Sequence, residues 1–313
     1  MASTDAAARC EAFLREAMGD RVRTAEPLGP RTTYRVGGAA AVFVEATSID
    51  DLRAARDAVV AAGVPVLVVG KGSNLLVADD GFDGLAVSLG EAFADIVVEG
   101  TLVRAGGAAA LPVVARRTVA AALSGFEWAV GVPGSIGGAV RMNAGGHGAD
   151  LAASLRSIRV VDLAGGEDGE VAADRLDLGY RRSNLTPTTV VVEATLQLVP
   201  GDRAAGEDAI AEIVRWRREN QPGGPNAGSV FTNPPGDSAG RLIDSAGCRG
   251  LRIGTAQVSA KHANFIQADP AGRADDVRAL MLEVQRRVLE HHGIALHPET
   301  VLIGYNPRPE VEG

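Results

Sequence analysis

Cysteine is scarce in this chain, with only Cys10 and Cys248 among 313 residues. Two cysteines are too few for a disulfide framework and lack the spacing of a zinc site, so we expect free thiols in a reducing cytoplasm and no metal centre. The sequence also has no run of about eighteen apolar residues and no basic N-terminal segment followed by an apolar one. We therefore expect neither secretion nor a membrane span.

Positive charge is in the minority as well. The formal net charge is −8 and the isoelectric point is near 5.2. This balance disfavours sequence-independent binding of nucleic acid, although it is compatible with a local basic pocket for a phosphorylated ligand. The length and the 46% content of hydrophobic residues are typical of a folded protein with two or three domains.

A glycine-rich stretch at residues 131–146, Gly-Val-Pro-Gly-Ser-Ile-Gly-Gly-Ala-Val-Arg-Met-Asn-Ala-Gly-Gly, is the strongest local signal. Each glycine destabilises regular structure by roughly 0.5–1 kcal/mol, so the cluster predicts an irregular cradle rather than a helix or strand. Its backbone N–H groups would bind a phosphate or a cofactor. A set of tight turns is the alternative interpretation.

A second glycine loop, residues 70–77, follows the short apolar strand predicted at residues 64–69. A dinucleotide fingerprint is excluded because Leu75 occupies its third glycine position and a strand pattern resumes there. A Walker loop is excluded because Gly72, rather than serine or threonine, follows Lys71. The sequence therefore predicts a phosphate-binding nest between two strands in some other fold.

The periodicity of apolar residues divides the rest of the chain into alternating helices and strands. The predicted helices are residues 6–18, 49–63, 111–123, 209–219 and 274–291; the predicted strands are residues 41–45, 85–89, 158–161, 190–198 and 258–266, with a hairpin at residues 97–105. The basic helix around Trp216 could bind RNA, but the acidic chain favours an ordinary solvated face. Residues 221–228 cannot be regular structure and would present Ser229 and Asn233.

Six motifs occur in one order between about residue 20 and residue 305, and together they resemble the UDP-N-acetylenolpyruvoylglucosamine reductase family. They are Arg-Thr-Thr-Tyr-Arg-Val-Gly-Gly at residues 31–38, the two glycine loops, Gly-Tyr-Arg-Arg-Ser at 179–183, the segment 228–234 and Leu-His-Pro-Glu at 296–299. The family contains flavin enzymes of bacterial cell-wall (peptidoglycan) precursor synthesis. The resemblance implies an α+β fold, with an FAD-binding domain of the vanillyl-alcohol-oxidase (PCMH) type in two α/β subdomains and a C-terminal α/β substrate domain. We place the lead-in at 1–30, the FAD domain at 31–200 and the substrate domain at 201–313.

The implied chemistry is a two-stage hydride relay. NADPH reduces FAD, and the flavin then delivers a hydride to the vinyl carbon of the enolpyruvyl ether of UDP-N-acetylglucosamine. Arg181 of the Tyr-Arg-x-Ser motif is implied to stabilise the resulting enolate, Ser229 to protonate it, and Glu299 to orient the enolate and the proton donor. Outside this context the three residues would be a surface ion pair, a turn-capping serine and an exposed glutamate.

Binding residues follow from the same resemblance. The two glycine loops would hold the FAD pyrophosphate, while Tyr180, Asn233, Lys261 and His262 would contact the substrate. The residues expected to bind the cofactor are Tyr34, Arg35, Gly70, Lys71, Gly72, Ser73, Asn74, Leu75, Gly131, Val132, Pro133, Gly134, Ser135, Gly138, Ala139 and Asn143.

The chain departs from the family pattern at three places. Thr232 replaces the usual lysine of Ser-x-Phe-Lys-Asn-Pro, which removes one phosphate-binding charge. His147 stands where the family commonly has an aromatic residue, and its imidazole is either an ionisable functional group of the loop or a passive spacer. The stretch between Ser183 and Ser229 is short and has no tyrosine, as in the subgroup that lacks the tyrosine-bearing lid loop.

Two other functions are compatible with parts of this pattern. A paralogue could keep FAD and the enolate chemistry but reduce another nucleotide-linked enolpyruvyl ether in specialised metabolism, which Thr232 would favour. A flavin-binding module without activity is disfavoured because Arg181, Ser229 and Glu299 are all present. We expect a cytoplasmic and monomeric enzyme with a small-molecule substrate, without nucleic-acid or membrane partners.

Overall fold

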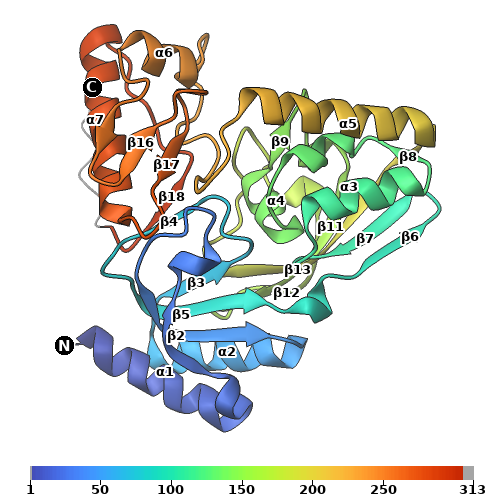
Figure 1. Ribbon diagram of the computed structural model, residues 1–313. Coiled ribbons are helices and arrows are strands. Elements are labelled where there is room, and N and C mark those ends of the chain that lie inside the picture. Colours follow the sequence, from blue (N-terminus) through green and yellow to red (C-terminus); the bar gives the residue numbers. More distant parts are fainter. Residues whose placement is uncertain (1, 306–313) are drawn as a thin grey trace. The chain divides into compact units, whose positions relative to one another are not determined.

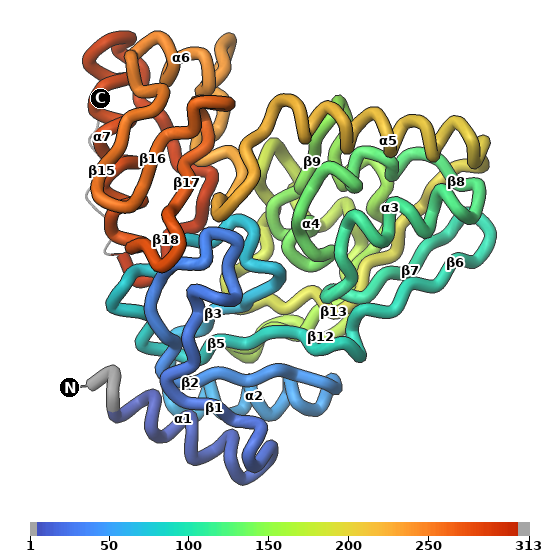
Figure 2. The backbone as a smooth tube through the Cα atoms, in the orientation of Figure 1, coloured from blue at the N-terminus to red at the C-terminus, as the bar shows by residue number. Residues whose placement is uncertain are grey.

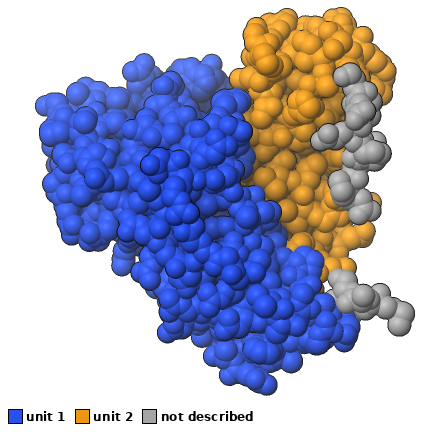
Figure 3. Space-filling model, turned by 180° about the vertical axis from the view of Figure 1, so that it is seen from behind, with its two compact units in different colours: residues 1–24, 42–71, 84–221 blue, residues 25–41, 72–83, 222–313 orange. Residues whose placement is uncertain are grey.

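The computed structural model describes residues 2–305, and the side chains from residue 5 onwards. Two compact units are formed, and neither is a continuous piece of chain (Figure 3). Unit 1 contains residues 1–24, 42–71 and 84–221, and unit 2 contains residues 25–41, 72–83 and the chain from residue 222 onwards. Two short segments of the N-terminal region therefore fold with the C-terminal part of the chain.

The first layer of unit 1 combines two helices with a small sheet (Figure 1). Helix α1 (Ala2–Met18) packs on α2 (Ile49–Ala62), and strands β2 (Ala39–Ala46), β5 (Phe82–Leu89) and β3 (Val66–Val69) lie side by side. Helix α2 is bounded by local signals. Ser48 accepts a hydrogen bond from the amide of Asp51 at its start, and Gly63 ends it in the left-handed conformation.

The second layer of unit 1 is a five-stranded antiparallel sheet covered on one face by three helices (Figures 1 and 2). The strand order is β12 (Asp168–Ala172), β11 (Leu155–Asp162), β13 (Thr189–Gln197), β7 (Leu102–Gly106) and β6 (Ile96–Glu99), and the helices are α3 (Leu111–Ala120), α4 (Ile136–Met142) and α5 (Arg203–Asn220). Alternate strand residues such as Ile158, Ala194 and Leu196 are buried beneath the helices. The pleat therefore sends the intervening polar side chains to the opposite face.

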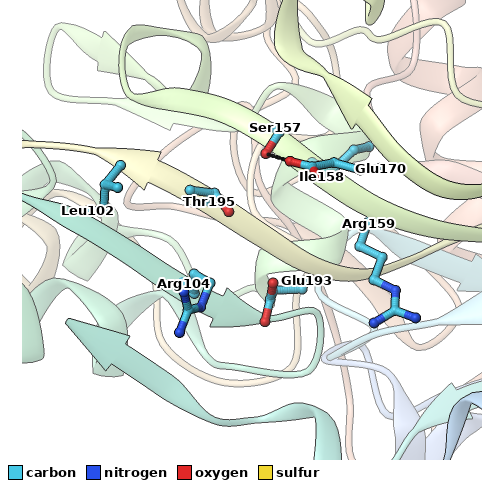
Figure 4. Close-up of a pocket in the computed structure, with 8 residues that line it drawn as sticks. All are labelled: Leu102, Arg104, Ser157, Ile158, Arg159, Glu170, Glu193 and Thr195. Atoms are coloured by element: carbon cyan, nitrogen blue, oxygen red, sulfur yellow. Dashed lines mark hydrogen bonds between the residues drawn. The ribbon is translucent and has the colours of Figure 1, made fainter. Parts of the chain in front are cut away.

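That opposite face carries a pocket lined by charged residues. Arg104, Arg159, Glu170 and Glu193 surround it, and Ser157 donates a hydrogen bond to Glu170 at 2.6 Å (Figure 4). The pocket contains none of the residues that the sequence predicts for a functional site.

Unit 2 has a small antiparallel sheet and two helices. Strands β15 (Arg252–Ile253), β16 (Ala256–Val258) and β17 (Ile266–Ala268) form the sheet, and α6 (Ala239–Ser245) and α7 (Ala274–His292) accompany it. Strand β4 (Leu75–Val77) pairs in parallel with β18 (Val301–Ile303). Tyr34 and Leu76 are buried in the same core as Phe231 and Val277, so the N-terminal segments complete the core of unit 2.

The remaining elements are short. They are the strands β1 (Arg23–Pro27), β8 (Leu123–Ser124), β9 (Gly145–Gly146), β10 (Ala149–Asp150) and β14 (Val199–Pro200). In addition, 3₁₀ turns occur at Gly19–Arg21, Gly29–Arg31, Glu91–Phe93, Glu127–Gly131, Leu151–Ala153 and Ala173–Arg175. Within residues 2–305, no helix combines the length and the apolar character that crossing a membrane requires.

The five predicted helices and the hairpin are confirmed, although α5 begins at Arg203, six residues before the predicted start. Two sequence predictions are wrong. Residues 258–266 are not one strand, because β16 ends at Val258 and β17 begins at Ile266 after a loop. The glycine-rich stretch is not irregular throughout, because α4 forms inside it with Ser135 as its N-cap and with Ile136, Ala139 and Val140 buried. The sequence reading also missed α6.

Candidate active site

The predicted site residues divide between the two units. Unit 1 contains Gly70, Lys71, the predicted residues of the 131–143 segment, Tyr180 and Arg181; unit 2 contains Tyr34, Arg35, residues 72–75, Ser229, Asn233, Lys261, His262 and Glu299. The structure therefore brings Ser229 and Glu299 together within one unit, while Arg181 belongs to the other.

In unit 1 the two glycine loops meet at Gly70. A Cβ atom added to Gly70 would lie 2.7 Å from Oγ of Ser135, closer than real Cβ contacts allow. Ser135 is buried, and its hydroxyl caps α4 by accepting the amide of Gly138 at 3.4 Å. Gly137 has a different role, because its amide donates to Gly107 O at 2.9 Å and a Cβ atom there would crowd the sheet. The side-chain-free backbone of Gly70 and of Gly138 thus lies next to Ser135, the capping residue of α4.

In unit 2 the loop after Gly72 packs on the 31–38 motif. Gly72 has φ = 60°, and a Cβ atom there would lie 2.1 Å from Arg31 O. The amide of Thr33 donates to Gly72 O at 3.1 Å. Gly72 is therefore required by the close approach of two protein segments, in addition to any ligand.

FAD carries a pyrophosphate and several hydrogen-bond acceptors, so its site needs bare backbone and donors. Gly70, Gly138 and the capped start of α4 provide the first. Unit 2, taken by itself, contains a donor at Tyr34, whose hydroxyl is fully buried and has no hydrogen-bond partner among the described residues. Burial raises the pKa of Tyr34, so its phenol is a proton donor at neutral pH. The residues present fit FAD.

A short backbone ladder fixes Ser229 and Glu299 close to each other. The amide of Glu299 donates to Val230 O at 2.8 Å, and Phe231 bridges Pro298 in antiparallel fashion. Both Ser229 and Glu299 are half-buried. Ser229 directly precedes Val230, and Glu299 is hydrogen-bonded to Val230. The same piece of backbone therefore supports a serine hydroxyl and a carboxylate.

Asn264, which the sequence reading did not select, holds this ladder from the other side. Its side chain accepts from the amide of Phe231 at 3.0 Å and donates to Phe231 O at 2.8 Å, while its carbonyl accepts from Val230 N at 2.9 Å. Asn264 is 4% exposed. A polar residue within an apolar run, Ala-Asn-Phe-Ile, was the available signal, because a buried amide needs partners.

Asn74 connects the second glycine loop to the same ladder. Its side chain donates to Glu299 O at 3.0 Å, and its own carbonyl accepts from the amide of Val301 at 2.9 Å. Asn74, a residue of the predicted cofactor loop, is thereby bonded to Glu299 and Val301, the two neighbours of Thr300. The position of Glu299 depends on this loop.

The predicted substrate-binding residues of unit 2 have distinct surroundings. Asn233 uses its side-chain oxygen to accept the amide of Ala239 at 3.0 Å, near the start of α6. His262 accepts the amide of Asn264 on Nδ1 at 3.2 Å. Burial, followed by the nearby charge of Arg249, lowers the pKa of His262. At neutral pH this imidazole is uncharged and carries its proton on Nε2. Lys261 is exposed.

Arg181 lies on a strained turn in unit 1. Its φ is 56°, and its Nη2 donates to Gly145 O at 3.1 Å. Its guanidinium also lies 5.1 Å from the centre of the Tyr180 ring, which is 60% exposed. The cation is therefore presented beside the end of the longer glycine loop. Asn143 of this loop is 2% exposed, and its side chain bonds Asp150, Gly179 and Ala152.

Two departures from the family pattern have defined contacts. His147 is exposed and meets Trp216 edge to face, with ring centroids 5.2 Å apart. A Cβ atom on Gly131 would lie 3.3 Å from the His147 ring, so the imidazole covers that glycine. Thr232 donates its hydroxyl to His297 O at 3.3 Å.

Comparison with known proteins decides the family. Residues 220–303 match the C-terminal domain of UDP-N-acetylenolpyruvoylglucosamine reductase, and residues 40–169 match an FAD-binding domain. The chain is 41% identical to UDP-N-acetylenolpyruvoylglucosamine reductase 2 of Symbiobacterium thermophilum, over 92% of this chain and 94% of the relative. It is 43% identical to the reductase of Heliobacterium modesticaldum, over 89% and 90%.

The chain belongs to the UDP-N-acetylenolpyruvoylglucosamine reductase family. A solved reductase structure from Thermus caldophilus is similar, with a TM-score of 0.78, 36% identity, and coverage of 90% of this chain and 99% of that one. The fold is accordingly an FAD-binding domain of the PCMH type joined to the C-terminal domain of this reductase family, and the chain is an FAD-dependent oxidoreductase. These matches confirm the family, the fold class and FAD as predicted from the sequence.

Proposed function

We propose that this protein reduces the enolpyruvyl ether of UDP-N-acetylglucosamine to UDP-N-acetylmuramate in peptidoglycan precursor synthesis, with FAD and NADPH as cofactors. The observation that carries the proposal is the backbone ladder that joins Glu299 to Val230, the residue directly after Ser229. Reduction of an enol ether needs a hydride donor and a proton donor on the two carbons of one double bond. Bound flavin supplies the hydride that it receives from NADPH.

Arg181 stabilises the negative charge that develops on the substrate carboxylate and the adjacent carbon. A guanidinium is planar and offers two parallel N–H donors, which suits a delocalised enolate. The bond from Nη2 to Gly145 O and the ring of Tyr180 restrict its movement. A donor that is already held in place costs little reorganisation during the reaction.

Ser229 donates the proton to the enolate carbon, and Glu299 orients that hydroxyl. A serine of ordinary acidity is a weak acid, so it must be held next to a strongly basic carbon. Bonds to Asn264 and Glu299 fix the backbone of Val230, directly after Ser229. The carboxylate of Glu299 accepts from the serine hydroxyl or from a water that replenishes its proton.

Substrate binding is assigned to Tyr180 in unit 1 and to Asn233, Lys261 and His262 in unit 2. The exposed ammonium of Lys261 suits the pyrophosphate of the UDP moiety, and the Nε2–H of neutral His262 is a donor without charge. FAD is assigned to Tyr34 and the two glycine loops. We further propose a cytoplasmic monomer of the subgroup without a tyrosine lid, because the residues between Ser183 and Ser229 contain no tyrosine.

A second candidate substrate is another nucleotide-linked enolpyruvyl ether. Thr232 favours it, since the hydroxyl bonds His297 O where the family usually has a lysine. Anaerobic spectroscopy separates the two. The purified protein should show a flavin spectrum that NADPH bleaches, and the cell-wall enolpyruvyl ether should restore it rapidly. A flavin that NADPH reduces and this substrate leaves reduced would indicate the second candidate, and a chain that retains no flavin would contradict both.

Ser229→Ala tests the proton donor. We expect substrate-driven reoxidation of the flavin to slow by about 10²–10⁴-fold, the usual contribution of general acid catalysis, while reduction by NADPH changes less than twofold. Ser245→Ala is the matched control, because Ser245 is an exposed hydroxyl on α6 of the same unit. Equal slowing of both half-reactions would contradict the assignment, and an unchanged reoxidation in Glu299→Gln would contradict the role of Glu299.

A further inference from the structure

The segment that carries Arg181 is fastened to α4 and to the residues directly after α4. Arg141, at the C-terminal end of α4, donates from Nη1 to Leu185 O at 2.5 Å and to Thr186 O at 2.6 Å. In return, the hydroxyl of Ser183 donates to Arg141 O at 2.7 Å. These three bonds join one helix residue to both the middle and the end of the segment 179–186. We call this arrangement the Arg141 clasp.

The start of the same segment is held by the residue that ends α4. Asn143 donates from Nδ2 to Gly179 O at 3.0 Å. The segment is thus bonded to the glycine loop at residues 179, 183, 185 and 186, on both sides of Arg181. All of these residues belong to unit 1.

Arg181 itself needs such support. Its φ of 56° lies in the left-handed region, which is unfavourable for a residue with a side chain. A strained conformation persists only where the surrounding bonds impose it. The clasp fixes the main chain on both sides of Arg181, and the bond from Arg181 Nη2 to Gly145 O then fixes its guanidinium.

Arg141 is well suited to hold main chain. It is half-buried, and among the described residues no carboxylate lies within ion-pair distance of its guanidinium. Its hydrogen-bonding capacity is therefore directed to two carbonyl groups. A charged donor on a neutral carbonyl makes a stronger bond than two neutral groups do.

We propose that Arg141 is a positioning residue for Arg181. Through Arg141, helix α4 inside the glycine loop determines where the enolate-stabilising cation is held. This inference rests on the proposed role of Arg181. Removing the guanidinium of Arg141 releases residues 183–186, and the left-handed turn at Arg181 relaxes. The cation then spends less time where the enolate forms, while hydride transfer from NADPH is unaffected.

The test is Arg141→Met, which keeps the aliphatic stem and removes the donors. We expect substrate-driven reoxidation of reduced enzyme to slow by about 10–50-fold, with NADPH-driven reduction within twofold of the parent protein. Arg141→Lys keeps one charged donor and should recover part of the rate. The matched control is Arg182→Met, which removes the same charge next to Arg181 but only a 3.4 Å contact with Asp177. It should leave both half-reactions within twofold.

Hydrogen exchange of the free protein gives a readout independent of catalysis. Amides of residues 179–186 should exchange at least tenfold faster in Arg141→Met, while those of β7 and β13 are unchanged. Ser183→Ala, a smaller change, should give the same pattern with a two- to fivefold effect on reoxidation, and it serves if Arg141→Met folds poorly.

The outcomes separate the clasp from the function. Faster exchange with unchanged reoxidation in Arg141→Met, alongside slow reoxidation in Arg181→Met, overturns the positioning role and leaves the proposed function intact. Unchanged exchange in both clasp variants overturns the inference directly. Unchanged reoxidation in Arg181→Met contradicts the proposed role of Arg181, and the positioning role fails with it.

Discussion

The side chain of Asn74 donates a hydrogen bond to the main-chain carbonyl of Glu299 at 3.0 Å, across 225 residues of sequence. The bond connects the second glycine loop to the main chain of Glu299, whose carboxylate we propose orients the proton donor. Since the amide of Glu299 in turn donates to Val230 O, a movement of Asn74 is passed on to the neighbour of Ser229. Asn74 of the glycine loop and the main chain next to Ser229, the proposed proton donor, are therefore parts of one hydrogen-bonded structure in unit 2.

Asn74→Ala should affect both stability and the second half-reaction. The loss of one half-buried hydrogen bond should lower the free energy of unfolding by about 1 kcal/mol, measured by urea titration. Substrate-driven reoxidation should slow more than NADPH-driven reduction, because Glu299 loses its support. Asn220→Ala is the control, since Asn220 is exposed and bonds only Trp216 O within its own helix. If Asn74→Ala and Asn220→Ala changed the unfolding free energy and the reoxidation rate equally, the claim that Asn74 supports Glu299 would be wrong.

Gly72→Ala should destabilise the protein far more than Gly100→Ala. The two glycines have nearly the same backbone, with φ of 60° and 61°. A Cβ atom at Gly72 would lie 2.1 Å from Arg31 O, whereas one at Gly100 meets nothing within 4 Å. We expect about 1–2 kcal/mol of strain at Gly100 and at least about 2 kcal/mol more at Gly72. Urea unfolding measures the difference, and equal losses would show that the backbone conformation alone matters.

Asp51 should make stability dependent on acidic pH. Arg21 donates to its two carboxylate oxygens at 2.7 and 2.8 Å and, with Thr47, holds the pKa of this buried carboxyl well below its usual range. A lowered folded-state pKa means that the stabilisation is complete above the unfolded pKa of about 4 and is lost as the pH falls towards the folded value. Asp51→Asn should therefore lower the free energy of unfolding by roughly 2 kcal/mol at pH 7 and by clearly less at pH 2.5. The loss at pH 7 is no larger because Arg21 is partly exposed and solvent screens the ion pair.

Asp50→Asn is the control for this experiment. Asp50 is the preceding residue, and its carboxylate is 90% exposed. We expect Asp50→Asn to change the free energy of unfolding by less than about 0.5 kcal/mol at either pH, measured by urea titration. If the cost of Asp51→Asn were the same at pH 7 and pH 2.5, the ion pair with Arg21 would not be its cause.

His262 should contribute to a loss of stability between pH 7 and pH 5. Burial lowers the folded-state pKa of His262, so the unfolded chain takes up its proton first when the pH falls below about 6.5. His262→Asn keeps an acceptor for the amide of Asn264 but cannot titrate, so its unfolding free energy should fall less steeply over this interval. His291→Asn, at an exposed position on α7, should keep the slope of the parent protein. Parallel pH profiles for all three proteins would contradict this account.

Local sequence determined the elements whose boundaries depend on neighbouring residues. Helix α2 could be predicted because Ser48 and Gly63 cap it and its apolar residues have helical spacing. The predicted strand at residues 64–69 was confirmed as β3 (Val66–Val69), since its β-branched residues stop at a glycine. The family and its FAD domain were also predictable, because the order of six motifs is a property of the chain itself.

Only the tertiary structure decided how distant segments combine. No pattern of adjacent residues predicts that Leu75 pairs with Val301, that Phe231 is the partner of Asn264, or that Arg141 bonds to residues 183–186. Helix α4 was missed for the same reason: its glycines disfavour a helix locally, and the burial of Ile136 and Val140 in the core outweighs that preference. Motifs predict which groups of this protein react. Long-range hydrogen bonds and packing, which have no counterpart in adjacent residues, determine where those groups are held.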